Sequence, residues 1–486
     1  MDTILTINIV IAVVFTCCYA YQLFFLAVPF TKKQEPHKPE VLHRFAILIC
    51  ARNEEAVIAD LIQSIRHQTY DQSLLTVFVM ADNCTDATAD IARREGAVVY
   101  TRFNREKVGK GYALEQLLLH IEEDYPKVYD GFFVFDADNV LDCRFVEEMN
   151  RTFSDGYEVV TSYRNSKNYG DNWISAGYAL WFIRESRYLN NSRMLLGTSC
   201  AVSGTGFLFS RQVMESTNGW KFHLLTEDIE FSVHHILQGR KIGFCADAVL
   251  YDEQPVTFRQ SWRQRLRWAR GFLQVFRKYG FGLVKGIGKG HFSCYDMSMT
   301  VMPAYILTVG LIIAYLVGGV MSTAEGISFL PCLMYILQTF LGLYVVLFLV
   351  GVFTTITEWK RIHTTPLRKV LYTVTFPLFM LTYIPISMVA LFSRKVQWKP
   401  IEHHRATGVW KPPAENNPAI PRRPAGVFCP GRTEGAAMDL NGKHYTWFQN
   451  RECEYFPCQR GAEEELTACS ATAPYRPRTA GQQRKG

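Results

Sequence analysis

Four long apolar tracts constrain this chain more than any other feature of its sequence. They cover residues 4–29, 299–321, 329–356 and 370–392. Each exceeds the roughly 20 residues that an α-helix needs to cross a bilayer. Basic residues follow the first tract and flank the last, a distribution that marks the cytosolic side of a membrane protein. The sequence therefore predicts an N-terminal transmembrane anchor at residues 1–31 and a transmembrane region at residues 296–393.

The first and last tracts each allow an alternative. The first could be a cleaved signal peptide, but it lacks a basic n-region and a small-residue cleavage site, and it exceeds a signal core of about 7–15 residues. We therefore expect an anchor. The last tract contains Pro377 and Pro385, which favour a broken or re-entrant segment. We expect two to three spans in residues 296–393 and a cytosolic tail.

Composition separates the part between the tracts from a membrane bundle. Overall, 48% of the residues are hydrophobic and 20% are charged, close to a globular average. The net charge of +7 comes from basic residues next to apolar tracts, which indicates a lipid bilayer as partner and no nucleic acid. The 13 cysteines have no disulfide-framework spacing through Cys332, so we expect a reduced, cytosol-facing main body.

Residues 40–290 alternate between short apolar runs and amphipathic segments. The predicted strands cover residues 45–50, 75–81, 97–100, 131–139 and 158–163. Helical apolar spacing separates them, so we expect a parallel, doubly wound α/β sheet. Ligands bind such sheets beyond the carboxyl ends of the strands.

Acidic residues stand at these strand ends and at one helix start. Asp136 and Asp138 in FDADN can face the same way, and a divalent cation would relieve their repulsion. A surface turn is an equally good interpretation. Asp82 ends another strand. Glu227 and Asp228 begin a helix, where the helix dipole stabilises acidic side chains. The alternative interpretation is that Asp228 acts as a general base.

Gln264, Arg267 and Trp268 share one face of a predicted interfacial helix at residues 258–280. Arginine offers a planar fork to phosphate oxygens, and tryptophan offers a flat apolar face to a sugar ring. The alternative places the arginines on lipid headgroups and the tryptophan in an aromatic belt. We expect lipid-facing roles for the other arginines of this helix, Arg263, Arg265 and Arg270.

The order Asp82, Asp136-x-Asp138, Thr226-Glu227-Asp228 and Gln264-x-x-Arg267-Trp268 resembles the membrane-embedded family 2 glycosyltransferases. These include the cellulose, chitin, hyaluronan and poly-N-acetylglucosamine synthases. The resemblance covers about residues 5–405. The segments YRNSKNYGDNWISAGYALWF and SGTGFLFSR look most like bacterial members. The resemblance implies an α/β GT-A fold, a Rossmann-like nucleotide-diphospho-sugar transferase domain flanked by transmembrane helices.

The resemblance also implies roles for individual residues. It implies a UDP-sugar donor, Mg²⁺ or Mn²⁺ at Asp138, and Asp228 as the catalytic base for inverting attack. Cys50 stands where proline is common and Arg52 where an aromatic is frequent, which leaves the base contacts open. The implied substrate-binding residues are Ala51, Arg52, Glu54, Asp82, Lys110, Asp136, Glu227, Gln264, Arg267 and Trp268.

The function implied is a multi-pass enzyme of the plasma membrane, with a cytosolic catalytic domain, that moves sugars from a UDP-sugar to a growing glycan. One alternative is non-processive transfer to a lipid acceptor, as in ceramide glucosyltransferases. A second is a non-catalytic membrane protein that senses nucleotide sugars, although a sensor has no need of Asp228.

The C-terminal part differs in composition. Residues 406–437 are rich in Pro, Gly and Arg, which predicts a disordered linker. Residues 438–486 contain HYTWFQNRECEYFPC, which resembles the start of a small cysteine-rich bacterial domain. Cys453 and Cys458 could hold a metal, but only Cys469 follows. We expect the last ~80 residues to reflect a fusion or a frameshift.

Overall fold

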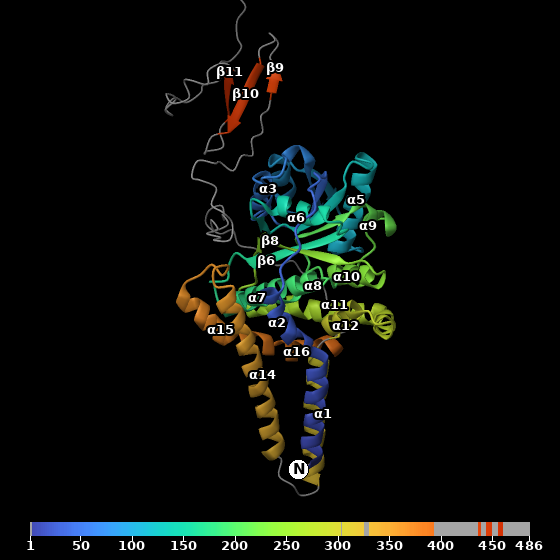
Figure 1. Ribbon diagram of the computed structural model, residues 1–486, viewed down its shortest axis with the longest axis vertical. Helices are drawn as coiled ribbons and strands as arrows, with labels where there is room; N and C mark the ends of the chain where they lie inside the picture. Colours follow the sequence, from blue (N-terminus) through green and yellow to red (C-terminus); the bar gives the residue numbers. More distant parts are fainter. Residues whose placement is uncertain are drawn as a thin grey trace, which may run out of the picture. The chain divides into compact units, whose positions relative to one another are not determined.

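The computed structural model describes residues 2–302, 304–324 and 330–392, and three short strands within 436–459. It forms two compact units, Met1–Arg422 and Arg423–Gly486. In the first unit, a sheet of eight strands supports the domain that we call the sheet domain (Figure 1). Its strand order is β3-β2-β1-β4-β7-β6-β8-β5. The strands are β1 (Phe45–Ala51), β2 (Leu75–Asp82), β3 (Val98–Arg102), β4 (Gly131–Asp136), β5 (Val140–Leu141), β6 (Val159–Ser166), β7 (Phe207–Ser210) and β8 (Ile242–Asp252).

The sheet is mixed, so the prediction of a parallel sheet is correct for only part of it. β3, β2, β1 and β4 are parallel, as are β6 and β8. β7 runs antiparallel to both β4 and β6, and β5 runs antiparallel to β8. β7 is only four residues long, so its side chains give little alternation by which a sequence could reveal it.

Helices cover both faces of the sheet because the strand side chains alternate between two cores. In β1, Ala46 and Leu48 pack into one core, while Phe45, Ile47 and Ile49 pack into the other. The helices and short turns of the sheet domain are α3 (Ile58–Arg66), η1 (Gln72–Leu74), α4 (Thr88–Arg94), α5 (Lys110–Asp124), α6 (Phe145–Ser154), α9 (Arg211–Ser216) and α10 (Glu227–Leu237).

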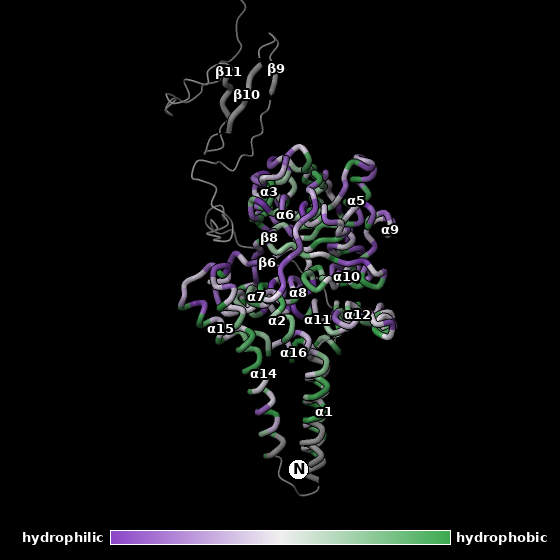
Figure 2. Tube along the Cα trace, in the orientation of Figure 1, coloured by the Kyte–Doolittle hydropathy of each residue, from purple (hydrophilic) through white to green (hydrophobic). Residues whose placement is uncertain are grey.

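A second group of helices joins the sheet domain to the apolar tracts. Figure 1 shows α1 and α14 extending away from the sheet domain, with α2, α15 and α16 at the junction. Hydrophobic residues dominate the parts of α1 and α14 nearest the sheet domain (Figure 2). The helices of this group are α1 (Asp2–Tyr19), α2 (Tyr21–Thr31), α7 (Trp173–Arg184), the π-helix η2 (Glu185–Asn190), α8 (Asn191–Leu195), α11 (Phe258–Gly288), α12 (Phe292–Val301), α13 (Ala304–Ala324), α14 (Leu330–Thr357), α15 (Pro366–Leu381) and α16 (Tyr383–Phe392).

Among the described residues, three helical stretches are long and apolar enough to cross a membrane: Ala12–Thr31, Leu333–Thr357 and Pro366–Phe392. The predicted tract 299–321 divides between α12 and α13. The share of buried residues is 11% and 6% in the first two stretches but 39% in the third. The third stretch therefore packs against protein more than the other two do.

The third stretch is also broken, at Thr382 between α15 and α16. Pro385 has no N–H to donate to the carbonyl of Leu381, four residues earlier, so a continuous helix would lose a hydrogen bond there. Figure 1 shows α15 and α16 along the base of the sheet domain, across the direction of α1 and α14. The break lets this segment follow the protein surface.

The second unit contains a three-stranded antiparallel sheet of β9 (Ala436–Met438), β10 (His444–Gln449) and β11 (Tyr455–Gln459). Cys458 lies in β11, opposite Thr446 of β10. Most of the predicted linker at residues 406–437 lies outside the described residues, as do Cys453 and Cys469.

Candidate functional site

The carboxyl ends of the parallel strands meet at one edge of a large cavity. The register pairs Cys50 of β1 with Asp136 of β4, and Asp82 of β2 with Arg102 of β3. The cavity has a volume of about 1050 Å³. Its lining includes every site residue that the sequence suggested: Ala51, Arg52, Glu54, Asp82, Lys110, Asp136, Asp138, Glu227, Asp228, Gln264, Arg267 and Trp268.

Asp82 is buried and forms an ion pair with Arg102, whose Nη1 lies 2.5 Å from Asp82 Oδ1. Arg102 also donates through Nη2 to the carbonyl of Lys107, 2.6 Å away. The sequence analysis did not identify Arg102. The pair holds one carboxylate of the cavity wall rigidly at the end of β2.

Lys110 begins α5 and connects two sides of the cavity. Its Nζ lies 2.5 Å from Asp136 Oδ1 and donates to the carbonyl of Gly204 at 2.7 Å. Gly204 has a φ of +81°, and a Cβ placed there would lie 3.7 Å from Asp228 Oδ2. Lys110 thus connects the end of β4 to the loop beside Asp228.

Asp138 and Asp252 both line the cavity and could contribute carboxylate oxygens to a divalent cation. Burial, with the charge of Asp138 as a further cause, raises the pKa of the Asp252 carboxyl. Arg164 partly balances the negative charge of Asp252, since its Nη2 lies 2.5 Å from Asp252 Oδ2. Oxygen donors of this kind suit Mg²⁺ or Mn²⁺ when substrate phosphates complete the shell. Within the described residues, no group of three or more His, Cys, Asp or Glu side chains is arranged to hold a metal ion by itself.

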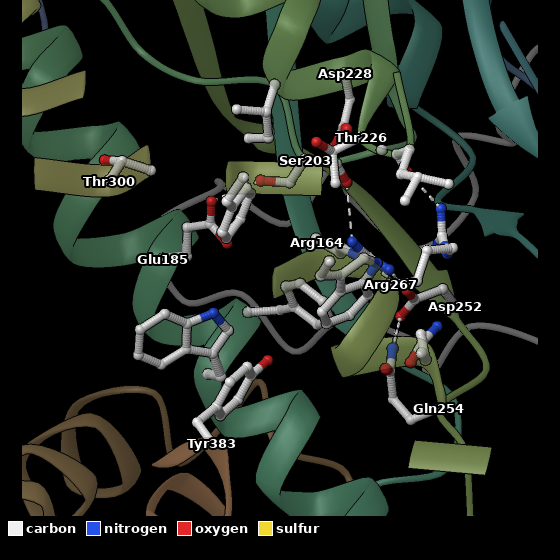
Figure 3. A pocket seen from close by; sticks show the side chains of 18 of the residues that line it. Arg164, Glu185, Ser203, Thr226, Asp228, Asp252, Gln254, Arg267, Thr300 and Tyr383 are labelled. Atoms are coloured by element: carbon white, nitrogen blue, oxygen red, sulfur yellow. Dashed lines mark hydrogen bonds and ion pairs between the residues drawn. The ribbon is translucent and has the colours of Figure 1, made fainter. Parts of the chain in front are cut away.

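Arg164 and Asp252 were missed by the sequence analysis because their position depends on the pairing of β6 with β8. Their register places Ser166 opposite Asp252 at the strand ends. Arg164 Nη1 donates to the carbonyl of Ser203 at 2.9 Å, and Gln254 donates to Asp252 at 2.5 Å. Figure 3 shows Arg164 lying between Ser203 and Asp252.

Glu227 and Asp228 form the first turn of α10, and both line the cavity. Burial raises the pKa of both carboxyls. The backbone N–H groups at the helix start and the positive charges of Lys110 and Arg267 oppose this increase for Asp228. A carboxylate with a raised pKa that faces a cavity is suited to accept a proton.

The predicted face of α11 reaches the cavity beside this acidic pair. Arg267 Nη1 donates to the carbonyl of Leu225 at 2.9 Å. Gln264 Oε1 is buried and has no hydrogen-bond partner among the described residues. Trp268 packs edge-on against Tyr178 and Phe182, with ring centroids 5.7 and 6.1 Å away.

Arg265 does not face lipid, contrary to the expectation. Its side chain is fully buried and donates to Phe379 O at 3.0 Å and Thr382 Oγ1 at 2.7 Å. Arg270 donates to the carbonyl of Ala390 at 3.2 Å. Both arginines bind backbone or hydroxyl groups of the broken α15–α16 segment, because this segment folds back over α11. Arg263 is exposed at the edge of the cavity.

Gly271 sets the distance between α11 and the acidic pair. A Cβ at this position would lie 2.5 Å from Thr226 Cγ2 and 2.6 Å from Thr226 Oγ1. Thr226 occupies the N-cap position of α10 but makes no side-chain cap hydrogen bond. The bulk of the Thr226 side chain therefore limits how closely α11 can approach α10.

Gly271→Ala should push α11 away from Thr226. If the sugar transfer implied by the resemblance takes place in this cavity, we expect the variant to lower it at least tenfold, since about 1 Å of misplacement can cost 100-fold. The readout is then kcat/KM for nucleotide release. Gly282→Ala, farther along α11, is the matched control, because its added Cβ would meet the side-chain end of Leu237 at 3.2 Å. Equal activity of the two variants would contradict the steric role of Gly271.

The half of the cavity away from the strand ends is apolar. Four residues of α14 line it at helical spacing, together with α1, α2, α15 and α16. The cavity therefore extends from the acidic residues to the helices of the apolar tracts. The α14 residues are Leu343, Val346, Leu347 and Val350.

Part of the chain is similar to known glycosyltransferases. Residues 43–271 match the family model described as "Glycosyltransferase like family 2". The chain is 27% identical over 272 residues to a beta-monoglucosyldiacylglycerol synthase of Nostoc sp. (strain PCC 7120 / SAG 25.82 / UTEX 2576), covering 54% of this chain and 56% of that protein. It is 23% identical over 257 residues to a poly-beta-1,6-N-acetyl-D-glucosamine synthase of Staphylococcus aureus (strain COL), covering 51% and 60%.

A solved mannosyltransferase from Pyrobaculum calidifontis, in complex with GDP-Man and Mn²⁺, is similar in fold. The TM-score is 0.50 at 14% identity, and the match covers 79% of this chain and 99% of that chain. The match spans less than two thirds of the length of each of the two curated relatives.

Proposed function

We propose that this chain, in which residues 43–271 form a glycosyltransferase family 2 domain on a GT-A fold, transfers a sugar from a nucleotide-diphosphate sugar to a membrane lipid. The observation that carries the proposal is that one cavity has both a charged wall and an apolar wall. It is lined by acidic and basic residues at the strand ends and by apolar residues of α1, α14 and α15 at its other end.

The donor would lie at the strand ends. Ala51, Arg52, Glu54 and Asp82 would line the base and ribose, and Lys110 and Arg267 would face the diphosphate. Asp138 and Asp252 would hold Mg²⁺ or Mn²⁺, which neutralises charge on the departing diphosphate. The mannosyltransferase of similar fold was solved with GDP-Man and Mn²⁺.

Asp228 would take the proton of the acceptor hydroxyl. The acceptor oxygen then attacks the anomeric carbon, and the bond from that carbon to the diphosphate oxygen breaks. The nucleoside diphosphate leaves with the bonding electron pair, and the proton stays on Asp228. In-line attack from the opposite face inverts the anomeric carbon. Lys110 and Arg267, which lower the pKa of Asp228, also keep this base ionised before the attack.

The apolar walls favour a lipid acceptor over the growing glycan suggested first by the sequence. A glycan needs hydrogen-bonding groups along its path, whereas Leu343, Val346, Leu347 and Val350 offer only hydrocarbon. The similarity to a protein named as a monoglucosyldiacylglycerol synthase supports this choice. The similarity to a poly-N-acetylglucosamine synthase keeps glycan extension as the second candidate.

The membrane arrangement that fits this function has α1, α13 and α14 crossing the bilayer and the sheet domain in the cytosol. α15 and α16 would lie at the cytosolic surface. Arg368, near the start of α15, and the exposed Leu367, Val370, Leu371 and Val374 would then face headgroups and lipid, respectively. This arrangement is multi-pass and returns the chain to the cytosol after α14.

The test is nucleotide release by the full chain in detergent with Mg²⁺ or Mn²⁺, a panel of UDP- and GDP-sugars, and bilayer lipids. A lipid that gains one hexose is the expected product. Product of high molecular mass would instead assign glycan extension. If the donor binds but no mixture gives nucleotide release or a product, the alternative that the protein only senses nucleotide sugars would remain.

We expect transfer to fall in acid, as the pH decreases through the raised pKa of the Asp228 carboxyl. Burial, followed by the charge of Asp228, raises the pKa of the neighbouring Glu227 to about 7. A proton on Asp228 removes the base, so the rate falls as the pH falls through its raised pKa. Glu227→Gln removes the neighbouring negative charge, which lowers the pKa of Asp228 and shifts the acid limb of the kcat/KM profile to lower pH. An unshifted limb would contradict this coupling.

A further inference from the structure

One arginine in the cavity wall carries a charge that no carboxylate balances at close range. Arg184 is the last residue of α7 and lines the cavity. Its Nη2 donates to Gln22 Oε1 at 2.8 Å, and its guanidinium lies over the ring of Trp181, 5.0 Å from the centroid. Nη1 is buried without a hydrogen-bond partner among the described residues. No described carboxylate lies within ion-pair distance of Arg184.

The carboxylates near Arg184 are engaged elsewhere. Asp296 accepts two hydrogen bonds from Arg193, at 2.7 and 2.9 Å, and one from Tyr21, at 2.8 Å. Glu185 accepts from the hydroxyl of Ser203 at 2.6 Å. Burial lowers the pKa of Arg184 to about 10, because the attraction of Glu185 does not offset the cost of desolvation. A partly buried guanidinium whose buried Nη1 has an unused N–H donor provides a site for an anion.

The position of Arg184 indicates which anion fits. Gln22 belongs to α2, at the junction where α1 leaves the sheet domain (Figure 1), the level of lipid headgroups in the proposed arrangement. The apolar wall of α14 lines the same cavity, as do Leu23 and Leu26 of α2. On the other side, Glu185, the next residue along the chain, accepts a hydrogen bond from Ser203, which belongs to the loop beside Asp228. Figure 3 shows Glu185, Ser203 and Asp228. Arg184 thus lies between a hydrocarbon compartment and the proposed base.

We propose that Arg184 binds the phosphate of the acceptor, so that the acceptor is a phospholipid with a hydroxyl-bearing headgroup and not neutral diacylglycerol. This inference rests on the proposed transfer to a lipid. The acyl chains would lie along α14, the phosphate at Arg184, and the headgroup hydroxyl at Asp228. The hydroxyl oxygen bonds to the anomeric carbon as described above, and the phosphodiester stays intact.

The first test measures lipid binding without turnover. The full chain is purified in detergent, and retention of phosphatidylglycerol is compared with that of diacylglycerol by native mass spectrometry. We expect wild type to retain phosphatidylglycerol at least tenfold better, Arg184→Gln to lose that preference, and Arg184→Lys to keep part of it. Arg277→Gln, an exposed arginine of α11 outside the cavity lining, controls for the loss of one positive charge.

Inorganic phosphate distinguishes a lipid site from a site for free phosphate. Displacement of the lipid only at phosphate concentrations far above the lipid concentration supports the lipid. Displacement at equal concentration, or equal retention by wild type and Arg184→Gln, overturns the proposal.

The second test measures transfer. Arg184→Gln should raise the KM for phosphatidylglycerol about tenfold or more and change the donor KM less than twofold, given the usual strength of a hydrogen bond to a charged group. Equal transfer to diacylglycerol and phosphatidylglycerol by wild type would overturn the phosphate assignment while leaving the transferase intact. If no donor supports transfer but Arg184→Gln still loses the lipid, the transferase proposal fails and the lipid site stands.

Discussion

Asp228→Asn is expected to lower sugar transfer by about 10²–10⁴-fold, the usual contribution of a general base. Asparagine has nearly the same shape as aspartate but cannot accept the acceptor proton. The first turn of α10 and the interaction of Lys110 with Gly204 should persist, so donor binding should change little. The measurements are kcat for nucleotide release and the donor Kd from calorimetry.

The control for this variant is Glu227→Gln, which removes one charge from the neighbouring position. We expect a smaller loss of kcat than in Asp228→Asn, together with the shift of the acid limb described above. Undiminished turnover in Asp228→Asn would remove the assignment of the base. A loss of donor binding in that variant would assign Asp228 to the donor site instead.

The second large effect concerns folding. Asp296→Asn should lower the free energy of unfolding by about 3–5 kcal/mol, because it leaves the guanidinium of Arg193 buried without its partner. Both side chains are 1% exposed. They lie on α8 and α12, and Tyr21 of α2 joins them through its hydroxyl. The measurement is unfolding of the purified protein by denaturant in detergent.

A double variant tests whether this buried position needs the charged pair or only two side chains that fit together. Arg193→Met combined with Asp296→Leu replaces both charges by apolar side chains, and we expect it to recover most of the lost stability. A double variant as unstable as Asp296→Asn would mean that the site needs polar groups for another reason.

The strand-end acids and the face of α11 could be predicted because they depend on local periodicity. Asp136 and Asp138 follow an apolar run, and Gln264, Arg267 and Trp268 have helical spacing. These local patterns place side chains on a face before the tertiary structure is known.

Other site features depend on segments distant in the chain. Arg164 lies 88 positions from Asp252 and meets it only because β6 pairs with β8. Arg265 was expected at lipid headgroups, yet α15 and α16 fold back and bury it. An arginine beside an apolar tract has the same local sequence pattern whether it faces lipid headgroups or lies buried in protein. Its role therefore depends on the segment that packs against it, which the local sequence does not reveal.

The continuous cavity has a consequence for kinetics. Under the proposed transfer to a lipid, an acceptor that entered the cavity between α1 and α14 would never have to dissolve in water. The quantity that saturates the reaction would then be the mole fraction of the acceptor in the bilayer. Diluting proteoliposomes with buffer would leave the rate per enzyme unchanged at saturating donor. Diluting the acceptor with inert lipid inside the same vesicles would lower that rate.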